Sequence, residues 1–367
     1  MTRIQSGCVV LSMMFGVSLA PAQFLSPLSS FGGGDGWLAP GEGGYGYLGT
    51  GHTERGLAFG NGHLYLVSRS GGNFIRILDP ATGADLGALD TTGISGGTFA
   101  VNTVAVGADG AIYVNNLTIQ SANSPFKVYR WDTESSAPTV VYSGDAGLSG
   151  ARVGDSLAAI GGGSSTRLAF GFGSAPAVTG NNGYMVLDPT TSTATAVAFA
   201  GTPPNAGDFR LGITFTDANH VLGSQGSSLY RHTSFAGASG TLLDTVIFPD
   251  PAGATADRLL AYAEVGGVPL LAVQSTGDSH VSLYDVTDPA NPIWLANGNN
   301  TTGPLVANPN ATGQLSWGNI SGNTAQLWAM SSNQGIQAFT VTIPEPATAT
   351  VLGLGLATLI ALRRTRR

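Results

Sequence analysis

Short apolar segments alternate with tight turns along the chain from Gly56 onward. Each unit has an apolar strand, a turn rich in Gly, Asn or Asp, and a second apolar strand, because such turns need the positive φ that these residues tolerate. The turns centre near residues 61, 109, 162, 218, 266 and 322, so they are 48 to 56 residues apart. The expected first strands are 56–59, 103–106, 157–160, 211–215, 259–264 and 315–320. The expected second strands are 63–67, 111–115, 167–172, 220–223, 268–273 and 324–330.

A third strand follows in every unit and ends before a polar turn, where an Asp side chain can cap the turn. The third strands are expected at 75–79, 128–132, 184–188, 229–233, 281–285 and 336–340. Asp79, Asp132, Asp188 and Asp285 stand at the ends of four of them and are interpreted as turn caps. A fourth strand is expected at 84–89, 139–142, 193–199, 241–247 and 292–295.

Four strands per unit with a period near 50 residues predict an all-β fold, a six-bladed β-propeller over residues 45–343. Only five fourth strands are present, so an N-terminal strand must close the last blade, and Tyr45–Leu48 is expected to supply it. Residues 23–44 are rich in Gly, Ser and Pro and are interpreted as a linker. A seven-bladed ring that uses residues 23–45 and a pair of β-sandwiches are the alternatives.

The two ends of the chain carry targeting signals. Arg3, the apolar stretch 8–19 and the small residues Ala20 and Ala22 predict a signal peptide over residues 1–22, cut after Ala22. At the other end, Pro344-Glu345-Pro346 precedes an apolar stretch at 347–362, which predicts a transmembrane helix. Basic residues close the sequence and are expected to stay on the cytoplasmic side: Arg363, Arg364, Arg366 and Arg367.

The motif, apolar helix and basic end at 344–367 together resemble the PEP-CTERM sorting tail of Gram-negative bacteria. The resemblance implies Sec export, a precursor anchored in the inner membrane by its C-terminal helix, and cleavage near Pro344–Pro346 by an exosortase. It also implies a final place in the cell envelope, on the outer surface or in the medium, in an exopolysaccharide or biofilm setting. An ordinary C-terminal anchor and a buried core helix are the alternative interpretations of this segment.

The charge of the chain limits the class of partner, and its cysteine content limits disulfide formation. Without the segments 1–22 and 344–367, ten basic residues face 21 acidic ones, a net charge of about −11. Such a surface argues against nucleic acid as a partner, because binding to phosphate needs basic patches. Cys8 is the single cysteine and lies in the predicted signal peptide, so no disulfide is expected afterwards.

No catalytic, cofactor-binding or metal-binding motif is recognised, and no two histidines have metal-ligand spacing in the sequence. We therefore expect no catalytic residues, no cofactor and no metal. Asp278-Ser279-His280 is either a polar cluster or a solvated loop. Trp317 falls on a predicted channel-lining strand, whereas Trp131, Trp294 and Trp328 are expected in the cores of the blades.

The fold suggests one place for a ligand. In a propeller, the first strand of each blade lines the central channel, so the residues before these strands meet at one mouth. These residues are Arg55, Asn102, Asp155, Arg210, Asp257, Arg258 and Gln314. Because their charges are mixed, we expect a neutralised polar ring that binds a polar molecule such as a glycan unit, with a merely wet, polar mouth as the alternative.

Three functions are compatible with these features. The first is an exported propeller that binds a ligand or acts as a scaffold in the envelope or matrix, and is not an enzyme. The second is a six-bladed hydrolase or lactonase, for which Asp155, Asp257 and Asn102 are the available site residues. The third is a purely structural coat protein, which the sequence does not separate from the first.

Overall fold

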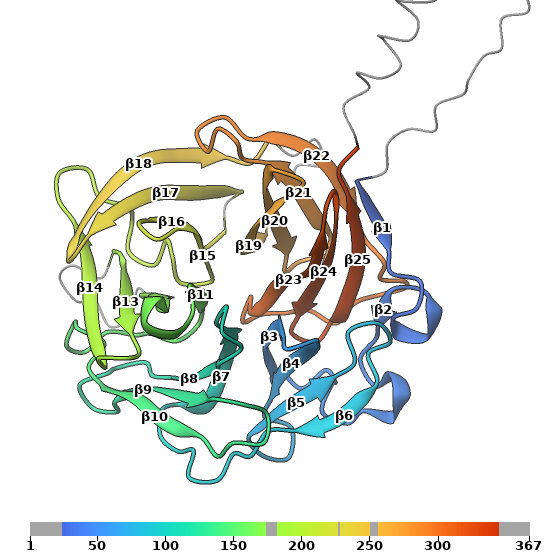
Figure 1. Ribbon diagram of the computed structural model, residues 1–367, viewed down its shortest axis with the longest axis horizontal. Helices are drawn as coiled ribbons and strands as arrows, with labels where there is room; N and C mark the ends of the chain where they lie inside the picture. Colours follow the sequence, from blue (N-terminus) through green and yellow to red (C-terminus); the bar gives the residue numbers. More distant parts are fainter. Residues whose placement is uncertain (1–23, 174–181, 227, 250–255, 345–367) are drawn as a thin grey trace, which may run out of the picture.

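The computed structural model describes residues 24–173, 182–226, 228–249 and 256–344. Within these ranges the chain is all-β, with three short 3₁₀ turns at Gly32–Gly34, Glu42–Gly44 and Gly163–Ser165. The sheets stand around a central axis in a propeller-like arrangement, with the first strand of each group innermost (Figure 1). The predicted all-β propeller-like fold is therefore confirmed.

The strands follow the predicted order. The innermost strands are β3 (Glu54–Gly60), β7 (Phe99–Val106), β11 (Ala158–Ile160), β15 (Gly212–Asp217), β19 (Asp257–Val265) and β23 (Gly313–Ser321). The second strands are β4 (His63–Ser68), β8 (Ile112–Leu117), β12 (Arg167–Gly171), β16 (His220–Ser224), β20 (Val268–Ser275) and β24 (Thr324–Ser331).

The third strands are β5 (Phe74–Leu78), β9 (Phe126–Trp131), β13 (Tyr184–Asp188), β17 (Leu229–Ala236), β21 (Val281–Asp285) and β25 (Gly335–Thr342). The outer strands are β6 (Asp85–Ala88), β10 (Thr139–Gly144), β14 (Thr193–Phe199), β18 (Ser239–Ile247) and β22 (Ile293–Gly298). Every strand expected from Gly56 onward is present, which confirms these sequence predictions. The two further strands, β1 (Leu25–Pro27) and β2 (Trp37–Leu38), come from the N-terminal segment.

Hydrogen bonding groups these strands into five sheets. Three contain four antiparallel strands each, β3–β6, β7–β10 and β19–β22. A fourth joins two antiparallel groups, β11–β14 and β15–β18, through a parallel pairing of β14 with β18 at Ala198↔Ser239 and Phe199↔Gly240. The fifth contains β23, β24 and β25 together with the N-terminal strands.

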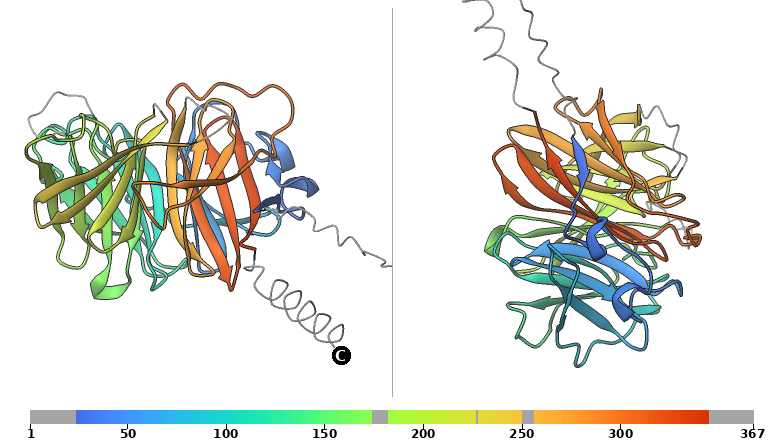
Figure 2. Two further views of the ribbon diagram at one scale, coloured as in Figure 1. Left: turned by 90° about the horizontal axis from the view of Figure 1, so that it is seen from above. Right: turned by 90° about the vertical axis from the view of Figure 1, so that its right-hand side faces the viewer.

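The N-terminal segment closes the last sheet, but with other residues than expected. β1 pairs with β25 at Leu25↔Val341, and β2 pairs with it at Trp37↔Gln337. The two ends of the described chain therefore lie side by side (Figures 1 and 2). Tyr45–Leu48 forms no strand, which corrects the prediction that it closes the ring.

The physical reason is that Tyr47 and Leu48 are buried beside β4 instead, where the Tyr47 carbonyl accepts from Ser68 Oγ at 2.7 Å. Earlier residues supply the apolar side chains next to β25. Phe31 is fully buried and Trp37 is 9% exposed, and the indole Nε1 of Trp37 donates to the Gln334 carbonyl at 2.8 Å. Burying such a side chain stabilises by about 1.5–3 kcal/mol, whereas a glycine such as Gly46 weakens a strand. β1 and β2 are thus paired with the last sheet, which corrects the interpretation of this part of residues 23–44 as a linker.

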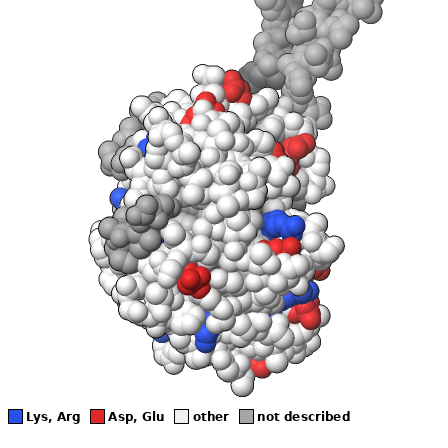
Figure 3. All heavy atoms as spheres, turned by 90° about the vertical axis from the view of Figure 1, so that its left-hand side faces the viewer, with Lys and Arg blue, Asp and Glu red and all other residues white. Residues whose placement is uncertain are grey.

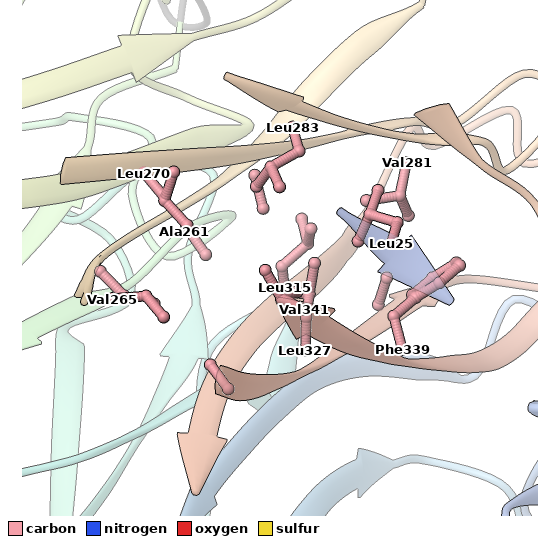
Figure 4. Close-up of a cluster of buried hydrophobic side chains, with 14 of the residues drawn as sticks. Leu25, Ala261, Val265, Leu270, Val281, Leu283, Leu315, Leu327, Phe339 and Val341 are labelled. Carbon is pink, nitrogen blue, oxygen red and sulfur yellow. The ribbon is translucent and has the colours of Figure 1, made fainter. Parts of the chain in front are cut away.

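Apolar side chains fill the space between neighbouring sheets. Between β19–β22 and the last sheet, Leu25 of β1 packs with Leu283, Leu327 and Phe339 (Figure 4). Trp131 and Trp328 are fully buried, as expected for these two core residues. Trp294 is 36% exposed on the outer strand β22, so its assignment to a core is wrong.

Three of the four Asp residues expected at strand ends cap turns. Asp79 Oδ1 accepts from the Thr82 amide at 2.8 Å, Asp188 from Thr190 at 2.9 Å and Asp285 from Thr287 at 2.8 Å. Asp132 instead forms an ion pair with Arg130 at 2.8 Å. The turn-cap interpretation is therefore confirmed at 79, 188 and 285 and corrected at 132.

Neither predicted targeting segment can be compared with the structure. Residues 1–22, with Ala20 and Ala22, lie outside the described residues, as do Glu345, Pro346 and the arginines at 363–367. Among the described residues, no helix has the length and apolar content needed to cross a membrane.

Candidate functional site at the mouth of the central channel

A cavity of about 210 Å³ runs along the axis of the molecule. All six innermost strands line it, and most of the lining residues are aliphatic, with Phe59, Tyr262 and Trp317 as its aromatic members. Trp317 therefore lines the channel, as predicted, and its indole Nε1 donates to the Ala261 carbonyl at 3.0 Å. No Asp, Glu, Lys or Arg is among the described residues that line this cavity, so the charged groups that precede or begin the innermost strands lie outside it, at its mouth.

Gln314 lies inside the channel and connects three of its strands. Its Oε1 accepts from the amides of Leu57 at 3.1 Å and Val104 at 3.3 Å. Its Nε2 donates to the carbonyls of Val104 at 2.8 Å and Leu157 at 3.1 Å. These four bonds use the whole capacity of the amide group, so Gln314 holds the channel strands together. It is not free to bind a ligand, which corrects its expected place among the binding residues.

Arg55 and Asn102 stand side by side at the start of β3 and within β7. Arg55 is 3% exposed and donates from Nε to Asn102 Oδ1 at 2.9 Å and from Nη1 to Thr312 Oγ1 at 3.0 Å. Asn102 in turn donates to the Gly154 carbonyl at 2.6 Å. Burial, with the charges of Arg69, Arg152 and Arg210, outweighs the opposing effect of Asp155 and lowers the pKa of Arg55 to about 10.

Asp155 is the acidic centre of the mouth. Its carboxylate accepts from Arg152 Nε at 2.7 Å and Arg152 Nη2 at 3.0 Å, and from Arg210 Nε at 2.9 Å. The Asp155 side chain is 1% exposed, whereas those of Arg152 and Arg210 are 21% and 23% exposed. Burial raises the pKa of Asp155, but the two arginines outweigh it and hold that pKa below its usual value.

The backbone around Asp155 is held by the neighbouring strands. Val153 exchanges both backbone hydrogen bonds with Thr118, at 3.1 and 3.0 Å. Gly154 has φ +107°, and a Cβ there would lie 2.2 Å from the Asn116 carbonyl oxygen, so only glycine fits. This segment therefore carries Arg152 and Asp155 to the mouth in a fixed orientation.

Asp257 and Arg258 begin β19 but face different partners. The Asp257 side chain is fully buried and lies 3.6 Å from Nε2 of His280. The Arg258 guanidinium packs on Gly226, and burial together with the charge of Arg210 lowers the pKa of Arg258. Arg258 thus belongs to the arginine cluster, whereas Asp257 contacts the Asp278–His280 loop, where His280 Nδ1 lies 2.7 Å from Asp278.

Two further arginines, which the strand pattern does not indicate, belong to this cluster. Arg152 precedes Asp155 by three residues, and Arg69 follows β4; its Nη2 donates to the His52 carbonyl at 3.0 Å. Arg69 and Arg55 both lie against the Phe99 ring, at 3.5 and 5.0 Å from its centroid. Neither missed arginine begins an innermost strand, so the rule used for the others had no signal for them.

We name five arginines around Asp155 the arginine mouth: Arg55, Arg69, Arg152, Arg210 and Arg258. The structure brings Arg55, Asn102, Asp155, Arg210 and Arg258 together, as the sequence predicted. Even with Asp155, Glu54 and Asp257 counted against the five arginines, a formal charge of +2 remains. Among the described residues, the mouth therefore holds more arginines than carboxylates, and the neutralised ring stays a prediction.

Charges elsewhere are sparse, as one face of the molecule shows (Figure 3). Within the described ranges, no group of three or more His, Cys, Asp or Glu side chains has a metal-binding arrangement. His220 and His232, which the sequence does not bring together, have ring centroids 5.8 Å apart on β16 and β17. Asp217 contacts the first at 2.8 Å and Asp244 the second at 3.0 Å.

Comparison with known proteins gives a family model and a similar fold. A family model described as a domain of unknown function, DUF4623, matches residues 45–224. The crystal structure of a DUF4623 family protein from Bacteroides eggerthii is 18% identical with a TM-score of 0.60, covering 81% of this chain and 72% of that chain. The structure of the major Malassezia sympodialis allergen Mala s 1 is 13% identical with a TM-score of 0.49, covering 78% of this chain and 91% of that one. No curated protein matches the chain. The first likeness concerns the fold alone.

Proposed function

We propose that the protein is an exported β-propeller that binds a polar ligand at the arginine mouth, in the cell envelope or the extracellular matrix. The observation that carries this proposal is the gathering of five arginines at one end of the channel in a chain with a net charge of −7. Charges of one sign repel one another, so such a cluster lowers the stability of the free protein, and a bound ligand of opposite charge would offset that repulsion. A glycan unit of an exopolysaccharide is the ligand that suits the proposed setting.

The setting rests on the two predicted targeting segments. The signal peptide 1–22 would direct the chain to the Sec machinery, and the PEP-CTERM-like tail 344–367 would present it to an exosortase. The precursor would be anchored in the inner membrane by residues 347–362 until cleavage, and the released protein would stay at the cell surface or leave the cell.

We further propose that the ring has six blades. The eight-stranded sheet divides at its parallel β14–β18 pairing into two groups of four antiparallel strands, and each group has its own strand at the channel. Counting these groups as two blades gives one blade for each innermost strand. The last blade would then take its outer strand from the N-terminal segment.

A binding function is favoured over a channel hydrolase by the state of the three residues proposed for catalysis. Asp155 is held by Arg152 and Arg210, Asn102 by Arg55, and Asp257 lies against His280. Their polar atoms are engaged with neighbouring side chains rather than converging on one point in the channel. This arrangement suits a rigid binding surface.

The test is a screen of the purified full chain against a broad set of bacterial polysaccharides. Binding is expected for the wild type and should weaken at least tenfold in an Arg152→Ala, Arg210→Ala double variant, because each charge-assisted hydrogen bond contributes about 1.5–3 kcal/mol. The double variant should be compared by circular dichroism with the wild type. If the wild type binds none of the polysaccharides, the scaffold or coat function replaces this proposal.

A further inference from the structure

Arginines at the mouth have fewer carboxylate partners than arginines elsewhere in the described chain. The four arginines of the described chain outside the mouth each pair with an Asp: Arg76 with Asp85, Arg130 with Asp132, Arg167 with Asp188 and Arg231 with Asp208. Among the five arginines of the mouth, only Arg152 and Arg210 have a carboxylate within 4 Å in the described residues, and they share Asp155. The sequence has enough acidic residues to pair every arginine, so the mouth is locally short of negative charge.

Several N–H groups at the mouth have no protein acceptor in the described part of the chain. Arg210 uses only its Nε on Asp155, which leaves both of its Nη groups. Arg258 forms no ion pair with a described residue, and its Nε is buried without a hydrogen bond. A guanidinium removed from water without an acceptor costs free energy, and an oxyanion placed against it recovers that cost.

Asp155 fixes where such an anion can bind. It holds Arg152 through two bonds and Arg210 through one, so these side chains are already oriented before a ligand arrives. A second anion beside Asp155 would be repelled, which leaves the side of Arg210 that faces Arg258. The backbone of Arg258 lies against β15 two residues after Arg210, since a Cβ on Gly212 would be 2.0 Å from the Arg258 carbonyl oxygen. In agreement with this proximity, the charge of Arg210 lowers the pKa of Arg258.

We infer that the ligand of the arginine mouth carries an oxyanion, such as the carboxylate of an acidic sugar, which binds between Arg258 and the Nη groups of Arg210. The inference rests on the proposed function and names the chemical class of its ligand. Arginine is suited to this task because its planar fork matches the two oxygens of a carboxylate and also fits phosphate. Asp155 acts as a positioning residue that holds Arg210 in place.

The experiment is calorimetric titration of the purified full chain with three probes: an oligomer of galacturonic acid, its carboxyl-reduced neutral counterpart and inorganic phosphate. The acidic oligomer should bind at least tenfold more tightly than the reduced one. Its affinity should fall as salt rises, because screening acts over about 8 Å at 0.15 M ionic strength. If only phosphate binds, the inference that the ligand carries an oxyanion stands, and that oxyanion is a phosphate rather than a sugar carboxylate.

Three variants and a matched control test the site. Arg258→Ala and Arg210→Gln should each weaken the acidic oligomer about tenfold, and Arg258→Lys should recover part of the loss. Arg167→Ala removes the same charge at the far end of β12, where Arg167 pairs with Ile160, and should leave affinity unchanged. Thermal unfolding of each variant confirms that it is folded.

The outcomes separate the two proposals. If the reduced oligomer binds as tightly as the acidic one and Arg210→Gln weakens both, ligand binding at the mouth stands and the oxyanion is overturned. If the acidic oligomer binds but neither arginine variant weakens it, both the site and the oxyanion assignment are overturned. If neither acidic oligomer nor phosphate binds, the oxyanion inference falls, and the polysaccharide screen alone decides whether the mouth binds another ligand.

Discussion

The carboxylate of Asp155 accepts a hydrogen bond from Nε of Arg210 at 2.9 Å, although 55 positions separate the two residues. Asp155 precedes β11 and Arg210 precedes β15, and these strands are neighbours at the channel. The contact therefore joins two groups of strands at the mouth. Asp155 is buried, whereas its two arginines are partly exposed. Its carboxylate therefore stabilises the site and neutralises part of the positive charge there.

Asp155→Ala should destabilise the protein by about 3 kcal/mol, because it leaves two partly buried guanidinium groups without their carboxylate. Urea unfolding monitored by fluorescence measures this change. Asp132→Ala is the control: Asp132 also pairs with an arginine but is 70% exposed, so its loss should cost less than about 1 kcal/mol. Equal effects of the two substitutions would contradict the central place of Asp155.

The pH dependence of stability should carry the signature of Asp155. Its pKa is lowered in the folded protein, so ionised Asp155 stabilises the fold at pH values above the unfolded pKa of about 3.9. This contribution is lost as the pH falls through the folded pKa. The difference in free energy of unfolding between the wild type and Asp155→Asn should therefore shrink between about pH 4 and pH 2. A difference that stays constant over this range would argue against the shifted pKa.

Closure by the N-terminal segment predicts that Trp37 is essential for stability. Trp37→Ala should cost about 3–5 kcal/mol, because it empties a buried site and removes the bond to the Gln334 carbonyl. Trp294→Ala, on the exposed outer strand, should cost less than about 1 kcal/mol. Deleting residues 24–38 should lower the melting temperature of the whole molecule. If the deletion leaves the melting temperature unchanged, β1 and β2 do not close the ring.

Gln314 should stabilise the channel through its amide group. Gln314→Leu keeps the approximate size but leaves the amides of Leu57 and Val104 and the Val104 carbonyl without their partner. Each buried group left unsatisfied costs about 1–3 kcal/mol, so the melting temperature should fall clearly. Gln326→Leu is a suitable control, since Gln326 lies on β24 and bonds Asn319 in an exposed pair. Similar melting temperatures for both variants would show that the channel bonds are dispensable.

The proposed sorting tail at 344–367 predicts proteolytic processing. In a host with an exosortase, the chain should be cut near Pro344–Pro346 and lose Arg363 to Arg367. Intact-mass measurement of the protein from the envelope and the medium tests this. Replacing Pro344, Glu345 and Pro346 by alanine should leave the uncut precursor in the membrane. A mature wild-type protein that still ends at Arg367 would disprove the sorting assignment.

The strand pattern could be predicted because it depends on neighbours in the sequence. Turns such as Asn61-Gly62 require residues that accept positive φ, and the apolar segments beside them must form strands to bury their side chains. The closing strand could not be predicted in this way. Tyr45–Leu48 and Leu25–Pro27 both contain suitable residues, and only the tertiary structure shows that Tyr47 lies beside Ser68 of β4 while Leu25 pairs with β25.

The sequence alone determined the all-β class and the order and approximate positions of the strands from Gly56 onward. It also determined the meeting of Arg55, Asp155, Arg210 and Arg258 at one mouth, since each precedes or begins a channel strand. Only the tertiary structure decided that Arg69 and Arg152 join them, that Asp257 faces His280, and that Gln314 is engaged inside the channel. Strand formation follows from local backbone preferences and apolar periodicity. The charge at the mouth depends on which side chains from distant segments lie within a few ångströms of each other, and closure of the ring sets those distances.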